Sequence, residues 1–121
     1  MKHLFALILL SFVAANAVHA QNDYYMRQAQ NYMRDADYYN KKADGYDREV
    51  EYYNKKAQGY LRDAEYYTRN NNLDRAKTYN RWAEEAMDKA RMYMRWSSDA
   101  REKAQMRMKW AQDAMERARR Q

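Results

Sequence analysis

A strict seven-residue period dominates this chain. One tyrosine stripe and one stripe of mostly alanine follow it without a break through residues 25–67. The tyrosines are Tyr25, Tyr32, Tyr39, Tyr46, Tyr53, Tyr60 and Tyr67, and the small stripe is Ala29, Ala36, Ala43, Val50, Ala57 and Ala64. Because an α-helix has 3.6 residues per turn, a period of seven keeps both stripes on one face and favours left-handed supercoiling. The pattern predicts an all-α fold in which alanine occupies position a and tyrosine position d of a coiled coil.

The period belongs to 14-residue repeats of two kinds. Residues 24–37, 38–51 and 52–65 are copies of one unit, and a fourth copy dissolves at the run Asn70, Asn71 and Asn72. A different unit begins at residues 81, 95 and 109, with alanine or serine at position a. Asparagine tolerates the left-handed backbone and caps helices, and the chain contains no proline. We therefore expect helices over about 22–69 and 73–120, joined by a turn at about 70–72.

A turn this short makes the two helices antiparallel neighbours. Folding the chain about it places Ala83 opposite Tyr60, and Ala86 opposite Ala57. A small residue in nearly every layer allows the helices to approach closely. The predicted architecture is an antiparallel coiled-coil hairpin of alanine and tyrosine.

Acidic residues precede basic ones by four positions in both helices, which is the favourable orientation for ion pairs on a helix. In the first helix this predicts pairs from Asp37, Asp44, Glu51 and Glu65 to Lys41, Arg48, Lys55 and Arg69. In the second helix it predicts pairs from Glu85, Asp99 and Asp113 to Lys89, Lys103 and Arg117.

Residues 1–20 have the features of a secretory signal peptide. Lys2 is followed by an apolar run from Leu4 to Leu10, and the segment ends in small residues at Ala20. The run is too short to span a bilayer, and no later segment is apolar enough, so no integral membrane contact is expected. We expect a secreted, extracellular protein whose mature chain is residues 21–121.

The mature chain would contain neither histidine nor cysteine, because both histidines lie within residues 1–20 and the sequence has no cysteine. The commonest general base, metal ligands and strongest nucleophile are thus missing. We expect no enzymatic activity, no metal site and no cofactor.

Two apolar surfaces remain outside the predicted seam. Positions c and g on one edge form an aromatic strip of Tyr24, Tyr38, Tyr52, Tyr66, Trp82, Trp96 and Trp110. Position e on the other edge forms a methionine strip of Met26, Met33, Met87, Met94, Met108 and Met115, joined by Leu61. Lateral association of hairpins would bury both strips.

Alternatives stay open for each feature. The tryptophans either cover the edges of Tyr60, Tyr46 and Tyr32 or form a surface for self-association. Gly45 and Gly59 are poor helix formers at position c, where they leave room for tryptophan side chains across an interface. The methionine strip suits either the interior of an oligomer or an adaptable binding edge.

Charge gives little support to a nucleic-acid partner. Residues 21–72 carry nine basic and nine acidic side chains, whereas residues 73–121 carry thirteen and eight. The basic residues are interspersed with acids and the chain is expected outside the cell, so nucleic-acid binding is not expected.

In the character of its tyrosine-rich repeats the chain resembles the repetitive secreted matrix proteins of invertebrates, such as shell-matrix, byssal or egg-coat components. No family motif matches residue by residue, so no functional site carries over. The resemblance implies an organic framework role, with self-association or other matrix proteins as partners. The alternative is a secreted binding protein whose tryptophans stack on a polysaccharide or lie on an anionic lipid surface.

Overall fold

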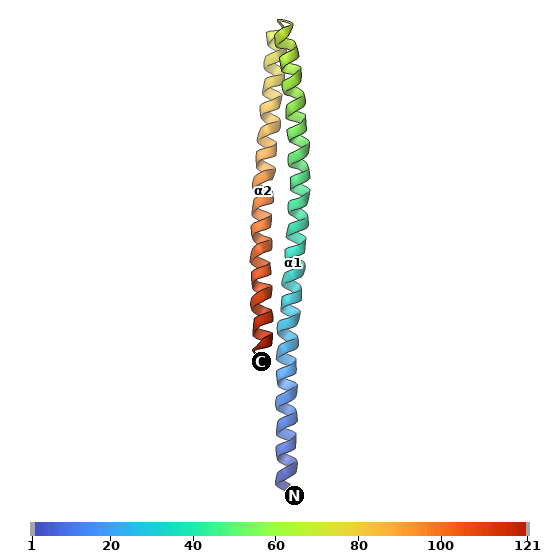
Figure 1. Cartoon of the computed structure of the whole chain (residues 1–121), viewed down its shortest axis with the longest axis vertical. Coiled ribbons are helices and arrows are strands. Elements are labelled where there is room, and N and C mark those ends of the chain that lie inside the picture. The colour runs from blue at the N-terminus through green and yellow to red at the C-terminus, as the bar shows by residue number, and fades with distance from the viewer. Residues whose placement is uncertain (1, 121) are drawn as a thin grey trace. The chain divides into compact units, whose positions relative to one another are not determined.

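The computed structural model describes the backbone of residues 2–120 and the side chains of residues 20–120. It contains two helices, α1 (Lys2–Arg69) and α2 (Leu73–Arg119), which pack against each other (Figure 1). The predicted all-α fold and the antiparallel pairing of two long helices are confirmed.

The helix α1 begins at Lys2 and not near residue 22. The expected start was set by the predicted end of a signal peptide, and that boundary carries no helix-breaking residue. Leucine and alanine, which dominate residues 4–10, are good helix formers, so the helix continues through them. The predicted signal peptide, residues 1–20, lies outside the described side chains except for Ala20 and stays a prediction.

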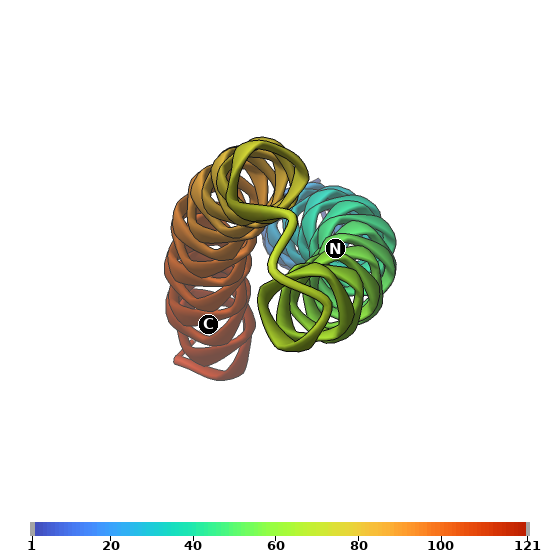
Figure 2. The same ribbon diagram turned by 90° about the horizontal axis from the view of Figure 1, so that it is seen from above.

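The asparagine run forms the turn, as predicted. Asn71 has a φ of 57°, the left-handed conformation that ends many helices. The backbone N–H of Asn72 donates to the carbonyl of Tyr67 at 2.8 Å, and that of Asn71 donates to Thr68 at 3.2 Å. Asn72 then caps α2, because its Oδ1 accepts from the backbone N–H of Arg75 at 3.3 Å. Figure 2 shows this connection from above.

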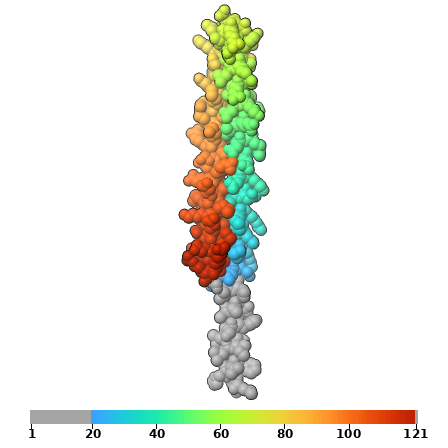
Figure 3. Space-filling view, in the orientation of Figure 1, coloured from blue at the N-terminus to red at the C-terminus, as the bar shows by residue number. Residues whose placement is uncertain are grey.

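The contacts divide the chain into two compact units, each made of one segment from each helix. Unit 1 is Met1–Tyr38 with Lys103–Gln121, and unit 2 is Tyr39–Glu102. In unit 2 the two segments run antiparallel on either side of the turn, with their side chains in contact (Figure 3).

Alanine alone supplies the buried hydrophobic side chains of the described residues. In unit 1 these are Ala29, Ala36, Ala104, Ala111 and Ala114, and in unit 2 they are Ala43, Ala57, Ala64, Ala76, Ala83, Ala86, Ala90 and Ala100. All thirteen occupy the predicted positions a and d, and the seam is therefore the one that the repeat predicts.

Tyrosines alternate across the seam of unit 2 in the predicted register. The Tyr93 ring stacks on Tyr53 at 5.8 Å and lies 6.1 Å from Tyr46. The Tyr79 ring likewise stacks on Tyr67 at 5.4 Å and lies 6.2 Å from Tyr60. Each tyrosine of α2 thus sits between two tyrosines of α1, which fixes the relative height of the helices within this unit.

The predicted ion pairs form only in part. Glu51 pairs with Lys55 at 3.0 Å and Glu65 with Arg69 at 2.5 Å, both exposed. Asp44 pairs with Arg101 of α2 at 3.1 Å instead of with Arg48. A partner on the facing helix competes with the local one because both are within reach of the same carboxylate.

Candidate functional site

The three tryptophans cover the edges of seam tyrosines. In unit 2, the Trp82 ring lies edge-on to Tyr60 at 5.7 Å and the Trp96 ring edge-on to Tyr46 at 5.6 Å. In unit 1, Trp110 stands in the same way to Tyr32 at 5.6 Å. Edge-to-face rings at such distances attract each other beyond the burial of their area. Covering the seam is therefore one role of these tryptophans, and it was one of the two interpretations left open by the sequence.

Covering the tyrosines does not bury the tryptophans. Trp82, Trp96 and Trp110 keep 40%, 44% and 38% of their surface exposed. An outward surface of each indole therefore remains available for a second contact.

The tyrosines of the aromatic strip lie further out. Tyr24, Tyr38, Tyr52 and Tyr66 are between 53% and 61% exposed. Tyr24, Tyr52 and Tyr66 each contact the next tyrosine in the chain edge-on, at 5.0–5.4 Å. Among the described residues these three rings make no contact with a tryptophan ring. The strip therefore consists of two rows, the indoles beside the seam and the outer tyrosines on α1.

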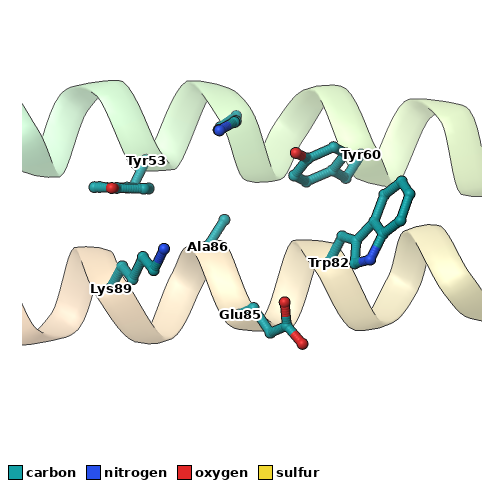
Figure 4. A pocket seen from close by; sticks show the side chains of 7 residues that line it. Tyr53, Tyr60, Trp82, Glu85, Ala86 and Lys89 are labelled. Atoms are coloured by element: carbon teal, nitrogen blue, oxygen red, sulfur yellow. The ribbon is translucent and has the colours of Figure 1, made fainter.

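A shallow groove of about 280 Å³ opens beside the Trp82 indole in unit 2 (Figure 4). Ala86 forms its floor. Tyr60 and Trp82 stand at one end, and Tyr53 with Lys89 stands at the other. Lys56 and Glu85 complete the lining. The groove thus combines aromatic walls with two ammonium groups and one carboxylate.

Unit 1 holds a second groove of the same construction, of about 290 Å³. Its lining residues are Gln28, Tyr32, Trp110, Asp113, Ala114 and Arg117. Those on α2 come in the order tryptophan, acid, alanine and base, which is also the order on α2 in the unit 2 groove. The 14-residue repeat therefore produces a recurring surface, although the aromatic strip alone did not predict grooves beside it.

The lysines of the unit 2 groove lie against tyrosine rings. The Lys89 ammonium is 5.3 Å from the centre of the Tyr53 ring, and the Lys56 ammonium is 5.4 Å from that of Tyr52. A hydrogen bond with Tyr52 raises the pKa of Lys56. The predicted Glu85 to Lys89 ion pair does not form among the described residues, although both side chains line the groove.

The two tyrosines of α2 that face the seam, Tyr79 and Tyr93, are half-buried. Desolvation is the main reason that the pKa of Tyr79 and of Tyr93 is raised above the ordinary tyrosine value. Both phenols are thus held in their neutral form to higher pH than an exposed tyrosine.

A polar cluster divides the methionine strip. The Ser97 hydroxyl donates to Asp47 Oδ1 at 2.5 Å, and the Arg101 guanidinium donates to Asp47 Oδ2 at 2.5 Å and to Asp44 at 3.1 Å. The hydrogen bond from Ser97, followed by that from Arg101, lowers the pKa of Asp47. Sequence reasoning missed this cluster, although serine at an a position was a signal for it.

The methionines consequently form two groups. Unit 1 has Met26, Met33, Met108 and Met115, and unit 2 has Met87 and Met94 together with Leu61. Met33, Met87 and Met115 are half-buried, whereas Met94 remains 55% exposed. Each group leaves apolar surface open on its own unit.

Within the part of the chain that the structure describes, no three histidine, cysteine or carboxylate side chains lie close enough to hold a metal ion. In the same part, neither helix includes a stretch long and apolar enough to cross a membrane. Comparison with known proteins finds no matching family, no matching curated protein and no matching solved structure.

Proposed function

We propose that this chain is a secreted, non-enzymatic structural protein, a coiled-coil building block of an extracellular matrix such as a shell organic matrix, a coat or a fibre. The observation that carries the proposal is the distribution of apolar side chains. Every buried hydrophobic residue among those described is alanine, while the large apolar side chains there are half-buried or exposed.

An alanine seam gives a helix pair little stabilisation. Burying one methylene or methyl group contributes about 0.8 kcal/mol, whereas a large apolar side chain contributes about 1.5–3 kcal/mol. The side chains with most to gain are the exposed ones, such as Trp96, Met94 and the outer tyrosines Tyr52 and Tyr66. Lateral association with further copies buries them, and the 14-residue repeat offers the same contact several times along one chain.

The test begins with expression of the full chain in secreting cells. An intact mass beginning at Gln21 in the medium is the expected result for the signal peptide. Sedimentation of that material over a wide concentration range, with circular dichroism on the same samples, should show strong helicity and a dimer, tetramer or filament. A helical monomer at every concentration would refute the building-block proposal.

The grooves support a second candidate function, binding of a polysaccharide. Aromatic faces suit sugar rings, and Trp82 and Trp110 stand at corresponding places in two grooves that also carry acidic and basic groups. An anionic lipid surface is a weaker fit, because it requires the closed seam to open. Titration with chitin, with another polysaccharide or with anionic vesicles would shift tryptophan fluorescence if this candidate is right. An unchanged spectrum with all three would exclude it.

A further inference from the structure

Two glycines on the aromatic edge are required neither by the backbone conformation nor by a close contact within the described chain. Gly45 and Gly59 lie inside α1 with φ in the ordinary helical range, so no turn requires them. A Cβ added at Gly59 would meet no atom within 4 Å, and one at Gly45 would meet only the Arg48 guanidinium at 3.8 Å, an ordinary contact. Alanine would fit at both places and is a much better helix former.

These glycines stand beside the tryptophans. Gly59 precedes Tyr60, whose ring is covered by Trp82, and Gly45 precedes Tyr46, whose ring is covered by Trp96. Each glycine is therefore level with one tryptophan of its own chain. The empty space at Gly59 shows that this tryptophan does not fill the room that the glycine leaves.

A second copy of the chain would fill the space at these glycines in a two-fold dimer. When two hairpins face each other across a two-fold axis parallel to the helices, residues keep their height along the axis, and α1 of one copy faces α2 of the other. Trp82 of the second copy then arrives level with Gly59, and its Trp96 level with Gly45. Both pairings follow from the heights of these residues within one chain, because a two-fold axis parallel to the helices allows no shift along them.

Coiled-coil geometry predicts four-residue holes on the surface of α1 at these heights. In coiled-coil packing a side chain enters a hole formed by residues i, i+3, i+4 and i+7 of the facing helix. One such hole is formed by Lys56, Gly59, Tyr60 and Asp63, and the other by Lys42, Gly45, Tyr46 and Glu49. Large side chains facing small ones interdigitate, and glycine gives an indole the deepest possible hole.

Lys89 takes part in the same contact. Between the two tryptophans, α2 presents Lys89, which arrives at a hole formed by Glu49, Tyr52, Tyr53 and Lys56 of the facing copy, where Glu49 and the Tyr52 ring attract its ammonium and Lys56 repels it. Neither Lys89 nor Glu49 forms an ion pair with another described residue of its own chain. A lysine beside a carboxylate and an aromatic ring gains from both.

From these observations we infer that the aromatic edge of unit 2 is the interface of a two-fold symmetric dimer, in which Trp82 and Trp96 of each copy enter the holes at Gly59 and Gly45 of the other. This inference rests on the proposed self-association and names its partner, a second copy, and its contact. The unit 2 groove faces the symmetry axis and is closed by the dimer.

The test compares two double variants. Gly45→Ala with Gly59→Ala fills the holes, while Asn40→Ala with Asn54→Ala makes the matched change at exposed residues of position e on the opposite edge. Both pairs are 14 residues apart in the same repeats, and both replace a poor helix former by a good one. Both variants should therefore raise the melting temperature of the dilute monomer.

Only the glycine variant should weaken dimer formation, at least tenfold by sedimentation equilibrium. Its tryptophan emission at high concentration should also lack the blue shift that burial of the indoles gives the wild type. A glycine variant that dimerises as tightly as the wild type would overturn this interface while leaving self-association intact. A wild-type chain that stays monomeric would overturn both.

Discussion

The alanine seam can be tested at Ala83, which is fully buried in unit 2. Replacing it by glycine removes one buried methyl group, worth about 0.8 kcal/mol, and lowers helix propensity by about 1 kcal/mol. The expected loss in free energy of unfolding is thus about 1.8 kcal/mol. The matched control is Gln58→Gly at an exposed position of α1, which loses helix propensity alone and should cost about 1 kcal/mol or less.

Thermal unfolding followed by circular dichroism at 222 nm measures both variants at one low concentration. For a domain of this size a loss of 1 kcal/mol lowers the melting temperature by roughly 4–8 °C. The Ala83→Gly protein should therefore melt well below the Gln58→Gly protein. Equal melting temperatures would mean that the Ala83 methyl group is not buried against α1, which would refute the antiparallel seam.

Three further outcomes are expected. The folded-state pKa of Asp47 is lowered, so the ionised carboxylate stabilises the fold above the unfolded pKa of 3.8, and this stabilisation is lost as pH falls through the folded pKa. Unfolding measured over acidic pH should show a loss within about 1 kcal/mol, because the carboxylate is exposed. The Asp47→Asn variant should abolish this pH dependence. Tyr79 and Tyr93 have raised pKa values, so their contribution to the free energy of unfolding is complete below the unfolded pKa of 10.0 and falls as pH rises above it. Melting curves at alkaline pH should show this loss of stability, and the Tyr79→Phe, Tyr93→Phe double variant should show a smaller loss. Asn72→Ala removes the cap of α2 and should cost about 1 kcal/mol in urea unfolding, whereas an unchanged midpoint would contradict the capping bond to Arg75.

Local signals in the sequence were strong enough to predict the turn and the seam. The left-handed Asn71 and the capping Asn72 depend on the chemistry of single residues and their neighbours. Burial of the thirteen alanines follows from a period of seven, which any helix converts into one face. In the structure α1 extends N-terminally past residue 22 to Lys2, because the intervening residues include no proline or glycine that would end a helix.

The sequence indicated the tryptophans beside the grooves, but not the other lining residues or their arrangement. The spacing of Trp82, Trp96 and Trp110 placed them on one edge, yet the choice between covering the seam and facing outward depends on side-chain conformations. The grooves needed the same information, because they lie between rings whose orientation the sequence does not encode locally. The cluster of Ser97, Asp47 and Arg101 joins residues about 50 positions apart, and such pairs form only when the register is known.

The sequence by itself determined that this chain forms two helices, which face is apolar and where the chain turns, because helical periodicity, caps and turns act over a few residues. Only the tertiary structure decided which tyrosine lies under which tryptophan, that Asp44 and Asp47 turn to Arg101, and that Gly59 faces empty space. Those features depend on the relative height of two helices, which is set by the sum of many contacts between distant residues.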